Sequence, residues 1–178
     1  MRNHSLRRLV AAGGVVALAL VGVACGDDKD DTAKTVTAKD YEFENLPKSV
    51  KSGTKLSLEN DSEKELHEMV VFRLKDTEKR PVADLAKLSE SEFDELAATP
   101  GPPAIVLLRP PGDAPQIDAV GDGTLTEKGR YLVACFIPTG ADPAAYLAAS
   151  EAATDGPPQV AGGPPHIVNG MFGEITVK

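Results

Sequence analysis

The chain has 178 residues, of which 42% are hydrophobic, and no internal repeat divides it, so we expect one domain with one ordinary core. Aromatic residues make up only 4%, tryptophan is absent, and the formal net charge is −8. The chain therefore has few side chains that could stack on bases, and its negative charge would repel a polyanion, so nucleic acid is not an expected partner.

The first 24 residues are predicted to be an export signal and not part of the fold. Arg2, Arg7 and Arg8 give a basic start, and residues 9–24 form an apolar and glycine run that ends beside Cys25. The run has 16 residues, fewer than the roughly 20 that span a bilayer. This pattern resembles the signal of bacterial lipoproteins. The resemblance implies acylation of Cys25 and an extracytoplasmic protein anchored by lipid to the bacterial cell membrane.

Removal of residues 1–24 takes away three positive charges and no negative ones, so the mature protein is more acidic than the full chain. Residues 25–34 follow as a polar, largely acidic run without hydrophobic periodicity. We expect a flexible tether there. The folded domain is then expected to span residues 35–178.

Three short segments between residues 34 and 74 alternate between apolar and polar side chains, which predicts β-strands. They run from Lys34 to Phe43, from Lys55 to Asn60, and from residue 69 to residue 74, with His67 at the head of the third. Turn residues separate them at intervals typical of an antiparallel sandwich.

A small helical insertion is predicted at residues 76–98. Val82 and Leu85 fall at helical spacing, and residues 89–92 have the Ser-x-x-Glu form of a capping box. We interpret its acidic residues as a solvated face, with a partner-docking surface as the alternative. The apolar run at 104–108 is either another strand or a buried connection.

In the last third of the chain, a glycine turn precedes an apolar segment from Tyr131 to Ile137, which predicts a strand that carries Cys135 at its far end. An alanine-rich helix is expected at residues 141–154, inside an insert near 139–164, and residues 172–177 alternate as a closing strand. These elements indicate an all-β fold with short helical insertions.

The possible metal ligands are few. The mature chain contains two histidines, His67 and His166, and one cysteine besides Cys25. If Cys25 carries lipid, Cys135 has no disulfide partner in an oxidising compartment. It is then either a small buried hydrophobic residue or a ligand. Together with Met171, five residues after His166, two imidazoles, a thiolate and a thioether form the ligand set of a blue-copper site.

These segments resemble the cupredoxin, or blue-copper, family, whose sandwich carries one histidine on an early strand and Cys, His and Met between its last two strands. The matching pieces are Tyr41-Glu42-Phe43, Gly53-Thr54-Lys55-Leu56, Asn60, His67 with Val70-Val71-Phe72, Gly129-Arg130-Tyr131, Cys135 with Pro138, and His166 with Gly170-Met171.

The resemblance implies a cupredoxin-like Greek-key β-sandwich that holds one copper ion in a type 1 site. Its ligands would be His67, Cys135 and His166, with Met171 as the weak axial ligand. The residues expected to surround the ligands are Asn60, Glu68 and Pro138.

The chain departs from the family pattern at two points. Plastocyanin-like members separate the cysteine and the second histidine by a few residues, whereas 30 residues lie between Cys135 and His166. Glu68 also stands where the family commonly has Asn. A long loop must therefore fold back to close the site, although the entropy of closure grows only logarithmically with length. Met69 is an alternative thioether, and core filling is its simpler role.

The function that this resemblance implies is one-electron transfer outside the cytoplasm, without enzymatic activity and with unidentified redox or copper-exchange partners. A copper-handling or scavenging protein without electron transfer is one alternative, and a metal-free interaction module is another. A hydrolase is not supported, because the sequence has neither a nucleophile elbow nor a Gly-rich phosphate loop.

Overall fold

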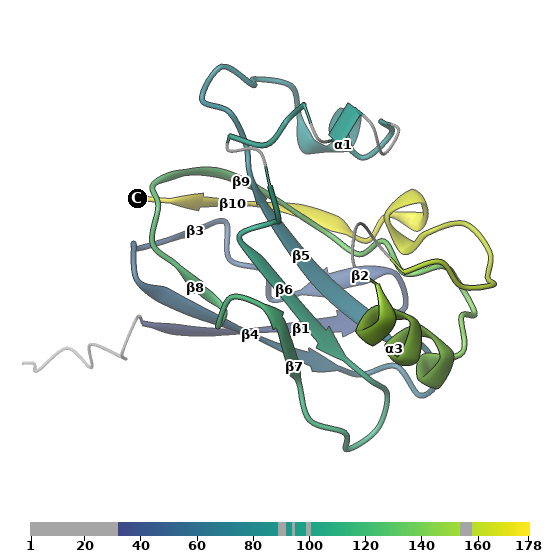
Figure 1. Ribbon diagram of the computed structural model, residues 1–178. Coiled ribbons are helices and arrows are strands. Elements are labelled where there is room, and N and C mark those ends of the chain that lie inside the picture. The colour runs from purple at the N-terminus through teal and green to yellow at the C-terminus, as the bar shows by residue number, and fades with distance from the viewer. Residues whose placement is uncertain (1–31, 89–91, 94, 99–100, 154–157) are drawn as a thin grey trace, which may run out of the picture.

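The computed structural model describes residues 32–88, 92–93, 95–98, 101–153 and 158–178. Within them the chain forms two β-sheets and a few short helices (Figure 1). The predicted fold class, an all-β sandwich with short helical insertions, is confirmed. The predicted export signal, Cys25 and most of the predicted tether lie outside the described residues. None of the helices in the described ranges is long and apolar enough to cross a bilayer.

The first sheet has the strand order β2-β1-β4-β8. Its strands are β1 (Ala33–Lys39), β2 (Glu42–Glu44), β4 (Thr54–Asn60) and β8 (Thr124–Leu125). β1 pairs with β4 in parallel, so the expected antiparallel arrangement is wrong for these two strands. The reason is that the chain crosses between them to the other sheet, where it forms β3 (Ser49–Val50).

Two predicted boundaries in this region are also wrong. The segment from Lys34 to Phe43 is not one strand, because the chain turns at Asp40 and Tyr41 and returns as the antiparallel β2. Both turn residues have left-handed backbone angles, with φ of 25° and 74°. β1 begins at Ala33, so the last two residues assigned to the tether belong to the sheet.

The second sheet has the order β3-β10-β9-β5-β6-β7. Its remaining strands are β5 (His67–Arg73), β6 (Ile105–Arg109), β7 (Ile117–Val120), β9 (Gly129–Ala134) and β10 (Phe172–Val177). The apolar run at 104–108 is therefore a strand, β6, which pairs with β5. β7 was not predicted, because three of its four residues are exposed and it pairs only with β6 in the described residues.

The main core lies between the two sheets. In β4, Leu56 and Leu58 are buried while Lys55 and Glu59 are exposed, which is the period of a strand with one face on a core. β5 and β9 instead have long runs of consecutive buried residues. A second apolar cluster covers the outer face of their sheet; it comprises Leu74, Leu85, Ala86, Phe93, Leu96, Leu132, Ala134 and Ile167.

The helices belong to the two predicted insertions and to the C-terminal loop. α1 (Val82–Leu85) lies in the insertion at 76–98, whose predicted capping box falls partly outside the described residues. α3 (Pro143–Ala152) is the predicted alanine-rich helix and lies apart from α1, at the end of the sandwich (Figure 1). The Asp142 side chain caps its first turn by accepting the N–H of Ala145 at 2.8 Å.

Candidate metal centre

Three chain segments meet at one end of the second sheet. His67 is the first residue of β5, and Cys135 directly follows β9. These strands are antiparallel, with Val70 opposite Ala134, so the start of β5 lies beside the end of β9. The third segment is the 3-10 helix η1 (His166–Asn169), which immediately precedes β10.

The structure brings the two histidines and the cysteine together. One ligand atom from each of His67, Cys135 and His166 lies within 4.8 Å of the other two, and all three residues are 0% exposed. The Nδ1 atom of His166 is 3.3 Å from the Sγ atom of Cys135. The two imidazole centroids are 5.0 Å apart. The grouping proposed from sequence is thus present in the folded chain.

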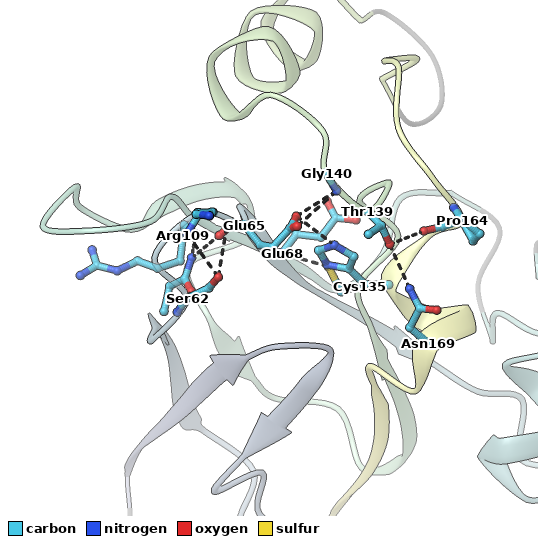
Figure 2. Close-up of polar contacts among 12 residues, drawn as sticks. Ser62, Glu65, Glu68, Arg109, Cys135, Thr139, Gly140, Pro164 and Asn169 are labelled. Carbon is cyan, nitrogen blue, oxygen red and sulfur yellow. Dashed lines mark hydrogen bonds and ion pairs between the residues drawn. The ribbon is translucent and has the colours of Figure 1, made fainter.

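The long segment between Cys135 and His166 does not separate the ligands, because it leaves the site and returns at the same place. Thr139 N–H donates to the carbonyl of Pro164 at 3.1 Å, and Gly163 N–H donates to the carbonyl of Thr139 at 2.8 Å. The Thr139 hydroxyl also donates to the Pro164 carbonyl and accepts from the Asn169 side chain (Figure 2). The insert is therefore closed at its base.

Main-chain hydrogen bonds fix the ligand residues to one another inside that closed base. Ile167 N–H donates to the carbonyl of Cys135 at 2.8 Å, and His166 N–H donates to the carbonyl of Ile137 at 3.0 Å. Pro138 forms a β-bridge with Pro165 at the same point. Backbone pairing, and not a short connection, thus places His166 beside Cys135.

Some donor atoms of this site have no hydrogen-bond partner in the described residues, which fits a metal ion. Both ring nitrogens of His67 are buried and accept or donate no hydrogen bond in the described part of the chain. Buried polar atoms without a partner are rare and costly, at about 1–3 kcal/mol each. Two imidazoles and one sulfur are donors that borderline and soft metals prefer, and an ion here would satisfy them.

Burial sets the protonation of the three residues. It lowers the pKa of His67 to about 4, with a smaller contribution from His166. It also lowers the pKa of His166, although the Glu65 carboxylate opposes that change. Burial raises the pKa of the Cys135 thiol well above its usual range, and Glu68 raises it further. At neutral pH the imidazoles are therefore neutral, and metal binding has to release the thiol proton.

Glu68 is buried beside the site and connects three chain segments. Its Oε1 atom accepts the N–H of Phe136 at 3.0 Å, its Oε2 atom accepts the hydroxyl of Tyr146 in α3 at 3.1 Å, and its own N–H donates to Cys135 Sγ at 3.5 Å. Burial raises the pKa of Glu68 to about 7, against the two hydrogen bonds, which lower it. One carboxyl group thus ties the inserted helix to the ligand strand.

The other predicted residues lie at or near the centre. Met171 is fully buried, and its backbone pairs with Cys135 and His166 at 3.1 Å each. Met69 is buried in the core between the sheets, which agrees with a packing role. The Asn60 side chain donates to the carbonyls of Glu65 and Arg109 and so fixes the loop before β5.

Sequence reasoning missed two residues that contact His166. The Oε2 atom of Glu65 is 3.5 Å from His166 Nε2, and the Tyr41 ring packs edge-on against the imidazole with centroids 4.9 Å apart. Glu65 stands in a charged run that indicates a solvated surface, so its sequence context gives no signal. Tyr41 was noted as part of a strand and of a segment that matches the cupredoxin family, but not as a contact of His166, and its left-handed turn is a tertiary feature.

No protein-family model matches the chain, and no curated protein matches its sequence. The fold is similar to several solved structures. A dithionite-reduced auracyanin from the photosynthetic bacterium Roseiflexus castenholzii is 17% identical, with 83% of this chain and 97% of that chain covered and a TM-score of 0.46. Auracyanin A, described as a "blue" copper protein from Chloroflexus aurantiacus, is 13% identical, with coverages of 82% and 98% and a TM-score of 0.42.

Auracyanin B is 17% identical, with coverages of 82% and 88% and a TM-score of 0.37. Identities and TM-scores of this size describe a distant similarity of shape. The assignment of the metal centre therefore rests on this chain's own residues. Three fully buried donors lie within 4.8 Å of one another, and the imidazole of His67 has no hydrogen-bond partner among the described residues.

Proposed function

We propose that this chain is a copper-binding protein with one type 1 site and that it carries single electrons. The observation that supports this most directly is the buried triad of His67, Cys135 and His166, whose ligand atoms lie within 4.8 Å of one another. Two imidazoles and a cysteine thiolate, completed by a thioether from Met171, are the donors that such a site uses. The proposal includes no catalytic residue, because electron transfer needs no substrate pocket.

Copper in this ligand set supplies a one-electron couple with little change of geometry between its two oxidation states. The chain's own contribution is rigidity. His67 begins the central strand β5, which lies between β9 and β6, and it pairs with Arg109 of β6. Cys135 and His166 are joined through the hydrogen bond from Ile167 N–H to the Cys135 carbonyl. A site held in this way resists rearrangement, which favours electron transfer over capture and release of copper.

We also propose that the protein works outside the cytoplasm and is attached to the membrane through lipid on Cys25. The basic start, the 16-residue apolar run and the small residues around that cysteine support this proposal. An intact-mass measurement of the membrane-extracted protein tests it. The mature wild-type chain should begin at Cys25 and carry acyl chains, and Cys25→Ser should abolish both the mass increase and the membrane association.

The copper proposal is tested by adding Cu(II) to the purified metal-free protein. The wild type should bind one equivalent and develop an intense visible band from thiolate-to-copper charge transfer, which Cys135→Ser should lose. Met171→Leu and Met69→Leu form a matched pair of buried thioether changes. We expect only Met171→Leu to shift the band and the reduction potential. Reversible one-electron voltammetry then tests the carrier role.

Each alternative gives a different result in the same titration. Colourless but stoichiometric Cu(II) binding, or binding without reversible voltammetry, would favour a copper-handling protein. No uptake by the wild type would favour a metal-free interaction module. Equal effects of the two methionine changes would remove Met171 from the ligand set.

A further inference from the structure

Glu65 contacts the ring of His166 on the side that faces away from Cys135. Its Oε2 atom is 3.5 Å from His166 Nε2, whereas His166 Nδ1 is 3.3 Å from Cys135 Sγ. We propose that Glu65 is a positioning residue of the metal centre: it keeps the imidazole N–H on Nε2 and leaves Nδ1 free to bind the ion. This inference rests on the function proposed above, because it assigns a role toward the same ion.

The chemistry follows from the donor and acceptor capacity of the two side chains. A neutral imidazole carries one N–H, on either nitrogen, and an ionised carboxylate can only accept. We assign the hydrogen to the nitrogen beside Glu65 and the lone pair to the nitrogen beside Cys135; at 3.5 Å from Glu65, Nε2 has no hydrogen-bond partner within the described residues. Metal-ligating histidines generally donate their second N–H to such an acceptor, which fixes the tautomer and the ring orientation. A shift of about 0.3 Å or more would bring the 3.5 Å contact into the usual hydrogen-bond range.

Glu65 is held in place by its own main chain. Its carbonyl accepts from the Asn60 side chain at 2.9 Å, and its N–H donates to the Ser62 hydroxyl at 3.1 Å. Asn60 also donates to the carbonyl of Arg109 at 2.8 Å, which ties this loop to the end of β6. The carboxylate is thus aimed at His166 by a loop with several anchors, and not by a freely rotating surface side chain.

The same carboxylate also holds the start of the long insert. Its two oxygens lie 3.3 Å and 3.2 Å from the N–H of Gly140, which donates to them (Figure 2). The Glu65 side chain is only 18% exposed, in contrast to the exposed Glu63 two residues earlier. Glu65 therefore links His166 to the start of the long insert between Cys135 and His166. It supplies orientation that a short Cys–His loop would provide by itself.

The test uses Glu65→Ala and Glu65→Gln, with Glu63→Gln as the matched control that removes one charge from the same loop. The first measurement is made on the metal-free full-length protein by long-range ¹H–¹⁵N NMR of the imidazole rings. The wild type and Glu63→Gln should hold His166 as the Nε2–H tautomer. Glu65→Ala should give a mixture of tautomers, and Glu65→Gln should keep the wild-type tautomer because its amide oxygen still accepts.

The second measurement is Cu(II) affinity by competition, together with the reduction potential. Glu65→Ala should lower the affinity about 10- to 100-fold, as loss of such a contact to a ligand does elsewhere. Glu65→Gln should retain most of the affinity but raise the reduction potential more than Glu63→Gln does. The negative charge of Glu65 lies closer to the ion and stabilises Cu(II), so its removal favours Cu(I). Both Glu65 changes leave the main-chain anchors to Asn60 and Ser62 intact.

The proposal is overturned if Glu65→Ala keeps the Nε2–H tautomer and binds Cu(II) as the wild type does. Should Glu65→Ala fail to fold, Glu65→Gln decides the matter: a potential equal to that of Glu63→Gln would overturn it. These failures differ from failure of the copper function. A wild type that develops no thiolate band refutes the copper site, while the metal-free tautomer measurement still decides whether Glu65 orients His166.

Discussion

Replacement of Glu68 by Gln should change the pH dependence of stability in a direction that the structure fixes. The residue is 5% exposed, and burial raises its pKa from 4.5 to about 7. The unfolded chain releases this proton near pH 4.5, whereas the folded chain keeps it until about pH 7. The folded state therefore binds more protons between these values, and its stability falls as the pH rises through that window.

The size of the effect follows from the shift. At about 1.4 kcal/mol per pKa unit, ionisation of Glu68 costs the folded state about 3 kcal/mol at pH 8 and less than about 1 kcal/mol at pH 5. Gln has no proton to lose, but it can accept only one of the two hydrogen bonds from Phe136 and Tyr146, a loss of about 1 kcal/mol. Glu68→Gln should thus be up to 1 kcal/mol less stable than the wild type near pH 5 and about 2 kcal/mol more stable at pH 8.

Urea unfolding of the metal-free protein from pH 5 to pH 8, under reducing conditions, measures this difference. The comparison of variant and wild type at each pH cancels the contribution of His67, which has the opposite sign. Glu63→Gln, an exposed change in the preceding loop, is the control and should not alter the pH profile. If the stability difference between Glu68→Gln and the wild type stays constant across this range, the inference that the folded protein keeps the Glu68 proton up to about pH 7 is refuted.

Other outcomes concern the ligands, the inserted helix and the core. His67→Leu should abolish copper binding yet stabilise the metal-free protein by about 1–3 kcal/mol at pH 7, since it removes two buried nitrogens without partners. This gain in the free energy of unfolding should be about 2 kcal/mol larger at pH 5. Because the pKa of His67 is lowered to about 4, its protonation opposes folding as the pH falls below 6.5. Equal gains at both pH values in urea unfolding would contradict this. Cu(II) affinity, measured by competition, should rise about tenfold per pH unit between pH 6 and 8, because binding releases the Cys135 proton; a flat profile would mean that the thiol is already ionised. Tyr146→Phe should cost about 1–2 kcal/mol and most at pH 8, where the ionised Glu68 loses a hydrogen-bond donor, and a loss independent of pH would assign Tyr146 to packing alone. Leu107→Ala, in the centre of the core, should cost about 2–5 kcal/mol by thermal or urea unfolding, and a loss below about 1 kcal/mol would contradict its full burial.

The local sequence pattern was sufficient to predict elements whose surroundings stay the same along their whole length. β4 alternates along its whole length because one face meets the core and the other meets water, so its sequence predicts it almost to the residue. α3 was found from its alanine content, whereas its cap, Asp142, was recognised only in the structure. The composition of the mature chain, with two histidines and one cysteine besides Cys25, also limited the possible ligands to a short set before any fold was known.

Local pattern failed where long-range contacts decide the conformation. The turn at Asp40 and Tyr41 was missed because a left-handed backbone is not typical of an aromatic residue such as Tyr41. The parallel pairing of β1 with β4 depends on a crossing through the other sheet. Glu65 was missed for the same kind of reason. Its neighbours in sequence are charged and solvated, and only the folded loop turns its carboxylate toward His166.

The sequence by itself determined which donors exist, that most of the chain forms strands, and that 30 residues separate Cys135 from His166. Only the tertiary structure decided that this separation is harmless, because hydrogen bonds between Thr139 and Pro164 close the insert at its base. The physical reason is that ligand type is a property of single residues, whereas distance, burial and protonation are properties of the neighbours that folding supplies. The buried ring of His67, which has no hydrogen-bond partner in the part of the chain that the structure describes, is such a property, and it is the feature that most directly indicates a metal.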